Sequence, residues 1–282
     1  MDSKYFDSSD EIAWCPGCGD FSILGAVKKA LAVHGREPKD VLLVSGIGQA
    51  AKLPHYVRAN CFNGLHGRAL PAAAGAKIAN RELTVIVTTG DGDCYGEGGN
   101  HFIHNIRRNL DITVVVHDNQ IYGLTKGQAS PTTDEGYVTK VQTTGVLAEP
   151  VKPLTLAISL GCGFVARGFS GEPDHLASLI VQGIGHRGFS LIDVLQPCVS
   201  FNKKNTFAWY KERIYKIEKD HNAADIDAAF KKAREWGDHI PIGMFYNIEK
   251  PCYEDKSGLA GLKPLIEYKP DDFVLGDVLQ EL

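Results

Sequence analysis

Short runs of apolar residues recur along the chain, separated by segments with helical character. The runs are rich in Val and Ile and cover residues 41–46, 83–90, 111–118, 163–168 and 190–196. Apolar residues occupy successive positions in them, which is typical of strands buried on both faces of a parallel sheet. We therefore expect these runs to form a mostly parallel sheet.

Segments between the runs predict helices, at residues 20–35, 69–80, 97–109 and 173–188. In the first of them Asp20 is a suitable N-cap and Gly35 a stop signal. Strand and helix alternate, which predicts an α/β fold with helices on both faces of the sheet. Beyond residue 200 this pattern fades. We expect one domain over residues 1–200, and a C-terminal arm over 201–282 that packs on the domain or on a partner subunit.

Composition narrows the classes of function. The chain has 282 residues, 44% of them hydrophobic, and a net charge of −4. It has no dense basic cluster, so nucleic-acid binding is not expected. The polar N-terminus does not resemble a signal peptide, and no apolar stretch approaches the ~20 residues of a membrane-spanning helix. We expect a cytoplasmic protein, in which some of the seven cysteines serve a metal, a cluster or redox chemistry rather than disulfides, while Cys94, Cys162 and Cys252 fit no ligand pattern.

Polar side chains follow two neighbouring predicted strands. Asp91 comes directly after the run 83–90, and Asn119 follows the run 111–118, 28 residues further along the chain. One helix fits between them, so both side chains should reach the crevice at the carboxyl ends of the strands. Oxygen donors of this kind suit Mg²⁺. Nearby glycines let a diphosphate approach the backbone: Gly90, Gly92, Gly96, Gly98 and Gly99.

Gly-Asp-Gly alone is equally typical of a simple turn. Together with the Asn-Gln-Ile-Tyr-Gly segment, however, it resembles the thiamine diphosphate motif, which begins with Gly-Asp-Gly and ends with Asn. This resemblance implies that Asp91, Asn119 and the carbonyl of Ile121 hold Mg²⁺. It also implies a set of cofactor-binding residues: Gly90, Asp91, Gly92, Asp93, Asn119, Ile121, Gly123, Leu124 and Thr125.

Several longer segments resemble one family, the β subunits of 2-oxoacid:ferredoxin oxidoreductases, and most of all the 2-oxoglutarate type. They are "WCPGCGDFSILGAVKKAL", "GIGQAAKLPHY", "LHGRALPAAAGAKIAN", the stretch from Gly90 to Thr133, and "PCVSFNKKNT". The resemblance spans about residues 12–210. It implies a 2-oxoacid substrate, coenzyme A and ferredoxin. It also implies an α subunit that completes the thiamine site, in a heterodimer or a dimer of heterodimers.

Cys15 and Cys18 form a Cys-x-x-Cys pair, which suits zinc or an iron–sulfur cluster; a thioredoxin-like dithiol is disfavoured because no convincing strand precedes it. The family resemblance implies a [4Fe–4S] cluster with Cys15, Cys18 and Cys198 as ligands. Where the family often has a fourth cysteine, this chain has Gln49. Three solutions stay open: Cys61 replaces the missing ligand, a non-cysteine group does so, or the cluster itself is altered.

Three side chains are candidates for substrate chemistry. His66 and Arg68 suit the 1-carboxylate of the substrate or the cofactor phosphate, since Arg can bind a carboxylate through two hydrogen bonds. Lys52 could pair with a distal carboxylate, which favours 2-oxoglutarate over pyruvate; a solvated surface charge is the alternative. Lys126 is a further cation near the diphosphate end. For His101 and His104, three positions apart, packing or hydrogen bonds on the helix surface are the favoured interpretation.

Three functions fit these features. The leading one is oxidative decarboxylation of a 2-oxoacid to acyl-CoA and CO₂, with electrons passed through the cluster to ferredoxin. The second is a non-oxidative thiamine enzyme, a decarboxylase or synthase, which would not need Cys15, Cys18 and Cys198. The third is a zinc-stabilised binding subunit without catalysis.

Overall fold

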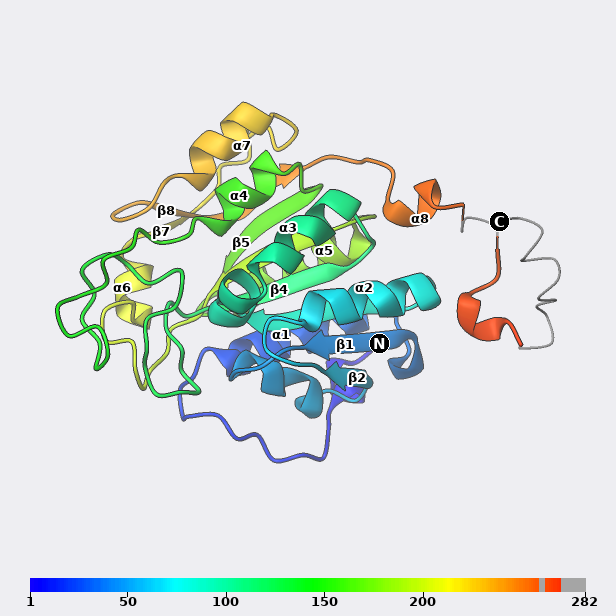
Figure 1. Ribbon diagram of the computed structural model, residues 1–282, viewed down its shortest axis with the longest axis horizontal. Helices are drawn as coiled ribbons and strands as arrows, with labels where there is room; N and C mark the ends of the chain where they lie inside the picture. The colour runs from blue at the N-terminus through cyan, green and yellow to red at the C-terminus, as the bar shows by residue number, and fades with distance from the viewer. Residues whose placement is uncertain (259–261, 270–282) are drawn as a thin grey trace.

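A central sheet organises the molecule in the computed structural model, which describes residues 1–258 and 262–269 (Figure 1). In this part of the chain eight strands share the sheet, in the order β2-β1-β3-β4-β6-β5-β8-β7. Every neighbouring pair is parallel except β5 and β8. The strands are β1 Val41–Ser45, β2 Asn60–Asn63, β3 Thr84–Gly90, β4 Thr113–Asp118, β5 Phe164–Phe169, β6 Ser190–Leu195, β7 Ile214–Lys216 and β8 Ile240–Asn247.

The predicted strands are confirmed, with bounds within two residues of those expected. Every residue of β4, β5 and β6 is buried, as the continuous apolar runs predict. Successive side chains point to opposite faces: Val85 and Val87 of β3 join one core, while Ile86 joins the other. Each such side chain contributes about 1.5–3 kcal/mol by leaving water, so the two cores together fix the register of the sheet.

Helices cover both faces, as expected (Figure 1). On one face lie α2 Ala69–Ala79, α3 Gly99–Arg108, α4 Pro153–Ser159 and α7 Ile226–Ala233. On the other face lie α1 Asp20–Val33 and α5 Pro173–Gly185, which pack against each other. Shorter elements complete the described chain: α6 Phe207–Lys211, α8 Tyr253–Lys256, and the turns η1 Ser3–Phe6, η2 Pro38–Asp40, η3 Ala50–Tyr56, η4 Gly92–Glu97 and η5 Leu265–Glu267.

The predicted N-cap of the first helix is wrong by one residue. Gly19 is the N-cap and Asp20 is the first helical residue. A Cβ at Gly19 would lie only 2.7 Å from Ser170 Oγ, so a capping side chain does not fit there. Asp20 is buried instead, and its Oδ1 lies 2.7 Å from Nδ1 of the buried His117. The carboxylate therefore links α1 to β4 rather than capping the helix.

The chain beyond residue 200 extends the sheet. β8 pairs antiparallel with β5, and β7 pairs with β8. A third core of Phe169, Leu195, Tyr210, Ile240 and Ile242 joins this part to the strands. The sequence pattern does not predict β8, because Pro241 and Gly243 interrupt its apolar run. In the described ranges, no helix has the length and apolarity needed to cross a bilayer.

Candidate active site

The residues predicted to hold the cofactor follow the carboxyl ends of β3 and β4. These strands are parallel neighbours, and Gly90 pairs in register with His117. Asp91 and Asn119 therefore leave the sheet side by side, each at the end of its own strand. This arrangement is the one expected of a site that holds a cation against a phosphorylated ligand.

Asp91 is a buried carboxylate with two hydroxyl partners. Its Oδ2 accepts hydrogen bonds from Ser130 Oγ at 2.5 Å and Thr132 Oγ1 at 2.6 Å. Burial raises the pKa of Asp91, and the two hydroxyl bonds oppose that rise. A cation at Asp91 would compensate the buried charge. Ser130 and Thr132 were not identified from the sequence, although they lie in the segment "ASPTT" within the family resemblance.

Asn119 and Ile121 form a tight turn at the end of β4. The side-chain Oδ1 of Asn119 accepts a hydrogen bond from the backbone N–H of Ile121 at 3.0 Å, and its Nδ2 donates to Gln196 Oε1. Gln120, between them, has a left-handed φ of 58°. Among the described residues no cluster of three or more His, Cys, Asp or Glu could hold a metal. The predicted Mg²⁺ donors include only one carboxylate, so they fit a cation shared with a diphosphate.

Asp93 connects three loops of the site. Its carboxylate accepts hydrogen bonds from the N–H groups of Ile47 at 3.1 Å and Gly67 at 2.7 Å, and from Thr89 Oγ1 at 2.6 Å. Oδ1 also lies 2.9 Å from His66 Nδ1. The sequence predicts that Asp93 binds the cofactor. In this geometry its oxygens are directed to protein groups, and Oδ1 faces His66 Nδ1 as an ion-pair contact without hydrogen-bond geometry.

Close backbone contacts hold these loops together. Gly67 has a φ of +71°, and a Cβ there would lie 2.4 Å from the carbonyl carbon of Glu97. A Cβ at Gly92 would lie 2.2 Å from the ring of Tyr122. Gly92 also begins η4, a π-helical turn, a conformation often found at functional sites. The glycines of the motif therefore serve loop packing as well as access to the backbone.

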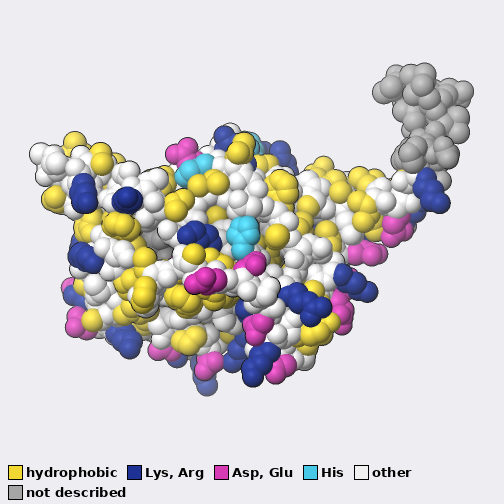
Figure 2. Space-filling view, turned by 90° about the horizontal axis from the view of Figure 1, so that it is seen from below, with side chains coloured by type: hydrophobic (Ala, Val, Ile, Leu, Met, Phe, Trp, Pro, Cys, Tyr) yellow, Lys and Arg dark blue, Asp and Glu magenta, His cyan; other side chains and the backbone are white. Residues whose placement is uncertain are grey.

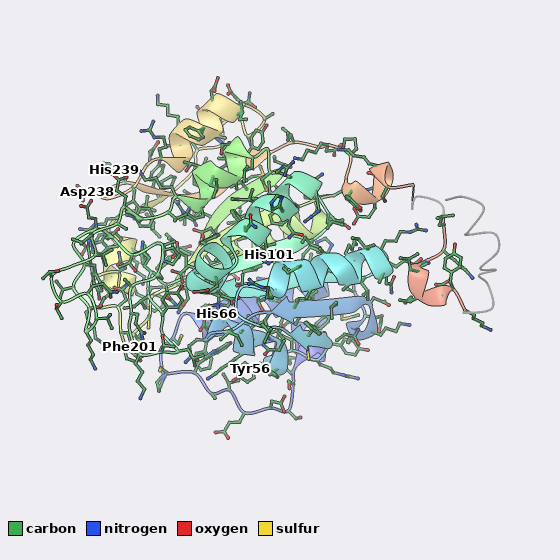
Figure 3. All side chains as sticks on the ribbon, viewed as in Figure 1. Tyr56, His66, His101, Phe201, Asp238 and His239 are labelled. Carbon is green, nitrogen blue, oxygen red and sulfur yellow. The ribbon has the colours of Figure 1, made fainter. Side chains whose placement is uncertain are left out.

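The candidate substrate residues lie around this loop cluster. Figure 3 shows His66 just ahead of the start of α2, and its side chain is 39% exposed. Arg68 is exposed and its Nη1 donates to the carbonyls of Gly67 and Glu97, each at 3.2 Å. Lys52 belongs to η3, where its Nζ donates to the Ala13 carbonyl at 3.2 Å. His66 and Arg68 thus lie together, whereas Lys52, from η3, bonds to the N-terminal segment at Ala13.

Three cysteines meet in a small pocket at the same end of the sheet. The pocket measures about 30 Å³, and its lining includes Cys15, Cys18, Cys198, Gln49 and Asn119. The thiols thus come together from two segments about 180 positions apart. Thiolates are the usual donors of iron–sulfur clusters, but as they lie here the three do not form one of the metal-holding groups among the described residues, so the cluster stays a prediction.

Cys18 is the most constrained of the three thiols. Its Sγ lies 3.4 Å from Asp20 Oδ2, to which it donates, and accepts from Gln196 Nε2, also at 3.4 Å. Burial raises the pKa of the Cys18 thiol, so a thiolate there needs a cation. Cys61, by contrast, is exposed in the middle of β2, where its backbone pairs with Leu43, outside the pocket.

The remaining cysteines behave as small apolar residues. Cys94, Cys162 and Cys252 are buried and lie outside the thiol pocket. Cys162 Sγ donates to the Phe164 carbonyl at 3.2 Å. Burial of this kind suits a packing role, and Cys252 Sγ in addition donates to Asp255 Oδ2 at 3.0 Å.

The structure also reveals a buried charged cluster that the sequence analysis missed. Tyr95 donates to Asp193 Oδ1 at 2.7 Å, and Arg167 Nε lies 3.8 Å from Asp193 Oδ2. Oγ1 of Thr132, the partner of Asp91, also lies 2.9 Å from Asp118 Oδ1. Burial raises the pKa of Asp193 to about 6 and that of Asp118 well above its usual range. The available signal was a charged residue inside an apolar run, as in "FVARGF" and "SLIDVL".

The loop after Asn119 borders an open groove of about 800 Å³. Ile121 and Lys126 line it together with Lys140, Lys203 and Lys204. The predicted cofactor residues Gly123, Leu124 and Thr125 lie in the same loop, which is closed by a hydrogen bond from Tyr122 N to the Gln128 carbonyl. Elsewhere, on the face of the molecule shown in Figure 2, Lys and Arg side chains are interspersed with Asp and Glu side chains.

The two histidines of α3 were expected to pack or to make hydrogen bonds on the helix surface. His104 Nδ1 lies 3.2 Å from Arg107 Nη1 on the helix surface. Burial and the nearby Arg68 lower the pKa of His101. Neither contact resembles a metal site.

Two family models match the chain. The model described as "Thiamine pyrophosphate enzyme, C-terminal TPP binding domain" matches residues 45–194, which include Asp91 and Asn119. The model for the C-terminal part of the pyruvate ferredoxin oxidoreductase beta subunit matches residues 198–260, which include Cys198.

Known proteins are similar over most of the chain. A 2-oxoacid:ferredoxin oxidoreductase subunit beta from Aeropyrum pernix is 47% identical over 86% of this chain and 80% of its own. The 2-oxoglutarate oxidoreductase subunit KorB of Mycobacterium tuberculosis is 41% identical, over 89% and 79%. The solved 2-oxoglutarate:ferredoxin oxidoreductase from Magnetococcus marinus, with 2-oxoglutarate, coenzyme A and succinyl-CoA bound, matches with a TM-score of 0.92 at 34% identity. That match covers 100% of this chain and 96% of the other.

Proposed function

Because the chain belongs to the β subunits of the 2-oxoacid:ferredoxin oxidoreductases, we propose that it uses Mg²⁺, thiamine diphosphate and an iron–sulfur cluster to oxidise 2-oxoglutarate. The family establishes the reaction class, oxidative decarboxylation of a 2-oxoacid with an iron–sulfur protein as electron acceptor. The proposal concerns the choice of acid, the metal and cluster, and the residues that act.

One observation supports the coupling of decarboxylation to electron transfer most strongly. Asn119, a predicted Mg²⁺ donor, directly follows β4 and also lines the pocket of Cys15, Cys18 and Cys198. The proposed thiamine site and the thiol pocket therefore share Asn119. A non-oxidative decarboxylase or synthase has no use for that proximity, so this alternative is not favoured.

Each group has identifiable holders in this chain. Asp91, Asn119 and the carbonyl of Ile121 would hold Mg²⁺, which neutralises the diphosphate. When bound, thiamine diphosphate supplies the electron sink for loss of CO₂. Cys15, Cys18 and Cys198 would hold the cluster, which takes electrons singly when bound.

The chain's own side chains bind and orient the substrate. Arg68 offers a planar cation to the 1-carboxylate, and His66, fixed by Asp93, can hold or release a proton at Nε2. Lys52 can pair with the distal carboxylate of 2-oxoglutarate, which pyruvate lacks. The similarity to 2-oxoglutarate enzymes supports the same choice.

Partners follow from the family. A β subunit implies an α subunit of the same enzyme and coenzyme A as second substrate. We propose that the thiamine site is completed by the α subunit, that a heterodimer or a dimer of heterodimers forms, and that ferredoxin receives the electrons. All seven cysteines are free, and Cys15 and Cys61 are exposed, which supports a cytoplasmic location where thiols stay reduced.

The test uses the complex isolated anaerobically from its host through a tag on this chain. Coenzyme A-dependent reduction of a viologen dye is measured with 2-oxoglutarate, pyruvate and a branched-chain 2-oxoacid in parallel. Reduction mainly with 2-oxoglutarate supports the proposal, and a preference for another acid refutes the choice of substrate. Iron, sulfide, zinc, magnesium and thiamine are measured on the same sample. Zinc without iron, sulfide or thiamine would instead support the zinc-stabilised binding subunit.

A further inference from the structure

The thiol pocket contains one side-chain oxygen that has no partner. Gln49 lines the pocket together with Cys15, Cys18 and Cys198. Its Oε1 atom is buried and accepts no hydrogen bond from any described residue. Leaving a buried amide oxygen without a donor is unfavourable, because the oxygen loses its water and gains no partner. The position of Gln49 therefore needs an explanation beyond packing.

The backbone of Gln49 is held against the segment that carries two of the thiols. Trp14 Nε1 donates to the Gln49 carbonyl at 3.0 Å, and Trp14 directly precedes Cys15. On the other side, a Cβ at Gly123 would lie 3.8 Å from Cys198 Sγ and 3.9 Å from Gln49 Cγ. Gln49 is thus fixed between the Cys-x-x-Cys segment and Cys198.

Two other oxygen-bearing side chains that line the pocket are engaged, whereas Ser200, which also lines it, is a second hydroxyl candidate. Asp20 Oδ1 faces His117 at 2.7 Å, while Oδ2 accepts from Cys18 Sγ. Asn119 Oδ1 accepts from Ile121 N. Gln49 Oε1 is free of such bonds and can serve a ligand in the pocket.

We propose that Gln49 Oε1 is the fourth donor to the cluster held by Cys15, Cys18 and Cys198, so that one iron lacks a thiolate. This inference rests on the proposed iron–sulfur function and specifies its ligand set. A neutral amide oxygen binds iron more weakly than a thiolate and contributes no negative charge. The fourth iron is therefore exchangeable, and the cluster has a higher reduction potential than one with four thiolates.

The exchangeable iron can be measured without an activity assay. Ferricyanide takes one electron from an oxidised cluster while the fourth iron leaves as Fe²⁺, in the balanced step [4Fe–4S]²⁺ → [3Fe–4S]⁺ + Fe²⁺ + e⁻. The anaerobic wild-type complex is treated with ferricyanide, and released iron and the EPR signal of the three-iron cluster are followed. We expect release of about one iron per cluster. Added ⁵⁷Fe²⁺ with a reductant should then refill that single site, which Mössbauer spectroscopy identifies.

Variants at position 49 assign the site. Gln49→Cys should slow iron release at least about tenfold and lower the reduction potential, because a thiolate replaces the amide. Gln49→Glu retains an oxygen donor and adds charge, so it should release iron at an intermediate rate. Gln182→Cys is the matched control, since Gln182 lies on α5, away from the pocket, and should behave as wild type. If Gln49→Cys does not fold, the rates of iron release from the wild type and from Gln49→Glu still show whether position 49 supplies the fourth donor.

Other results would overturn the inference. A wild-type cluster that keeps all its iron under ferricyanide would show a fourth strong ligand. In that case Cys61→Ser and Ser200→Ala identify whether Cys61 or Ser200 supplies it. Equal iron release from wild type and Gln49→Cys would also refute the role of Gln49. A complex without iron or sulfide would refute the cluster itself, so failure of the proposed function is distinguishable from failure of this ligand assignment.

Discussion

Thr132 Oγ1 lies 2.6 Å from Asp91 Oδ2, although the two residues are 41 positions apart in the sequence. The hydroxyl orients the carboxylate that we propose as the Mg²⁺ ligand. Thr132→Ala should weaken Mg²⁺-dependent binding of thiamine diphosphate about 10- to 100-fold, the effect of losing a hydrogen bond to a charged group. Calorimetric titration of the complex with the cofactor checks this. Thr155→Ala, which removes an exposed hydroxyl on α4, is the control; equal affinities in the two variants would contradict the role of Thr132.

The close contact at Gly67 predicts a large effect of one added methyl group. Gly67→Ala should lower the free energy of unfolding by more than about 2 kcal/mol, since φ is +71° and the Cβ would overlap the backbone of Glu97. Gly75 is exposed inside α2 and has open space around it, so Gly75→Ala should raise the free energy of unfolding by about 0.5–1 kcal/mol. Denaturant unfolding measures both. A stability loss in both variants, or in neither, would refute the contact as the cause.

His66 should matter for catalysis because Asp93 holds it beside the glycine loops. His66→Gln should lower kcat/KM at least about a hundredfold by removing proton transfer at the imidazole. His104→Gln, on the surface of α3, should leave the rate near that of the wild type. Steady-state viologen assays compare the two. A near-normal rate for His66→Gln would leave His66 a purely structural role.

Lys52 should distinguish 2-oxoacids by their distal group. Lys52→Met should raise KM for 2-oxoglutarate about 10- to 100-fold, as expected for loss of a charge-assisted hydrogen bond, and leave KM for pyruvate nearly unchanged. Lys29→Met, which removes an exposed charge paired with Asp174, is the control. If both acids are affected equally, Lys52 acts through its bond to the Ala13 carbonyl rather than on the substrate.

The raised pKa of Asp193 should make the stability of the fold depend on pH. Burial raises its pKa in the folded chain to about 6, above the ordinary 3.8, so the folded state binds the proton more tightly. The cost of the buried charge is present above pH 6 and disappears as the pH falls toward 4. The stability of wild type relative to Asp193→Asn should therefore rise by on the order of 2–3 kcal/mol between pH 7 and 4. Urea unfolding at several pH values tests this, and a constant difference would contradict it.

The sequence predicts the strands well, because burial on both faces of a strand leaves a continuous apolar run. It also predicts the residues at the strand ends, because Asp91 and Asn119 are polar residues that each follow such a run. It does not predict β8, where Pro241 and Gly243 break the run although packing against β5 still forms the strand. Nor does it identify Ser130 and Thr132. Hydroxyl residues in a loop carry no periodic signal, and only the fold brings them to a carboxylate about 40 positions earlier.

The position of β8 at the edge of β5 has a consequence for biosynthesis. β5 is complete by residue 169, but its antiparallel partner spans Ile240–Asn247. During translation at about 5–20 residues per second, the edge of β5 therefore stays unpaired for several seconds. An open strand edge can pair with another nascent chain. The β subunit should depend on chaperones during that interval, more than its completed sheet suggests.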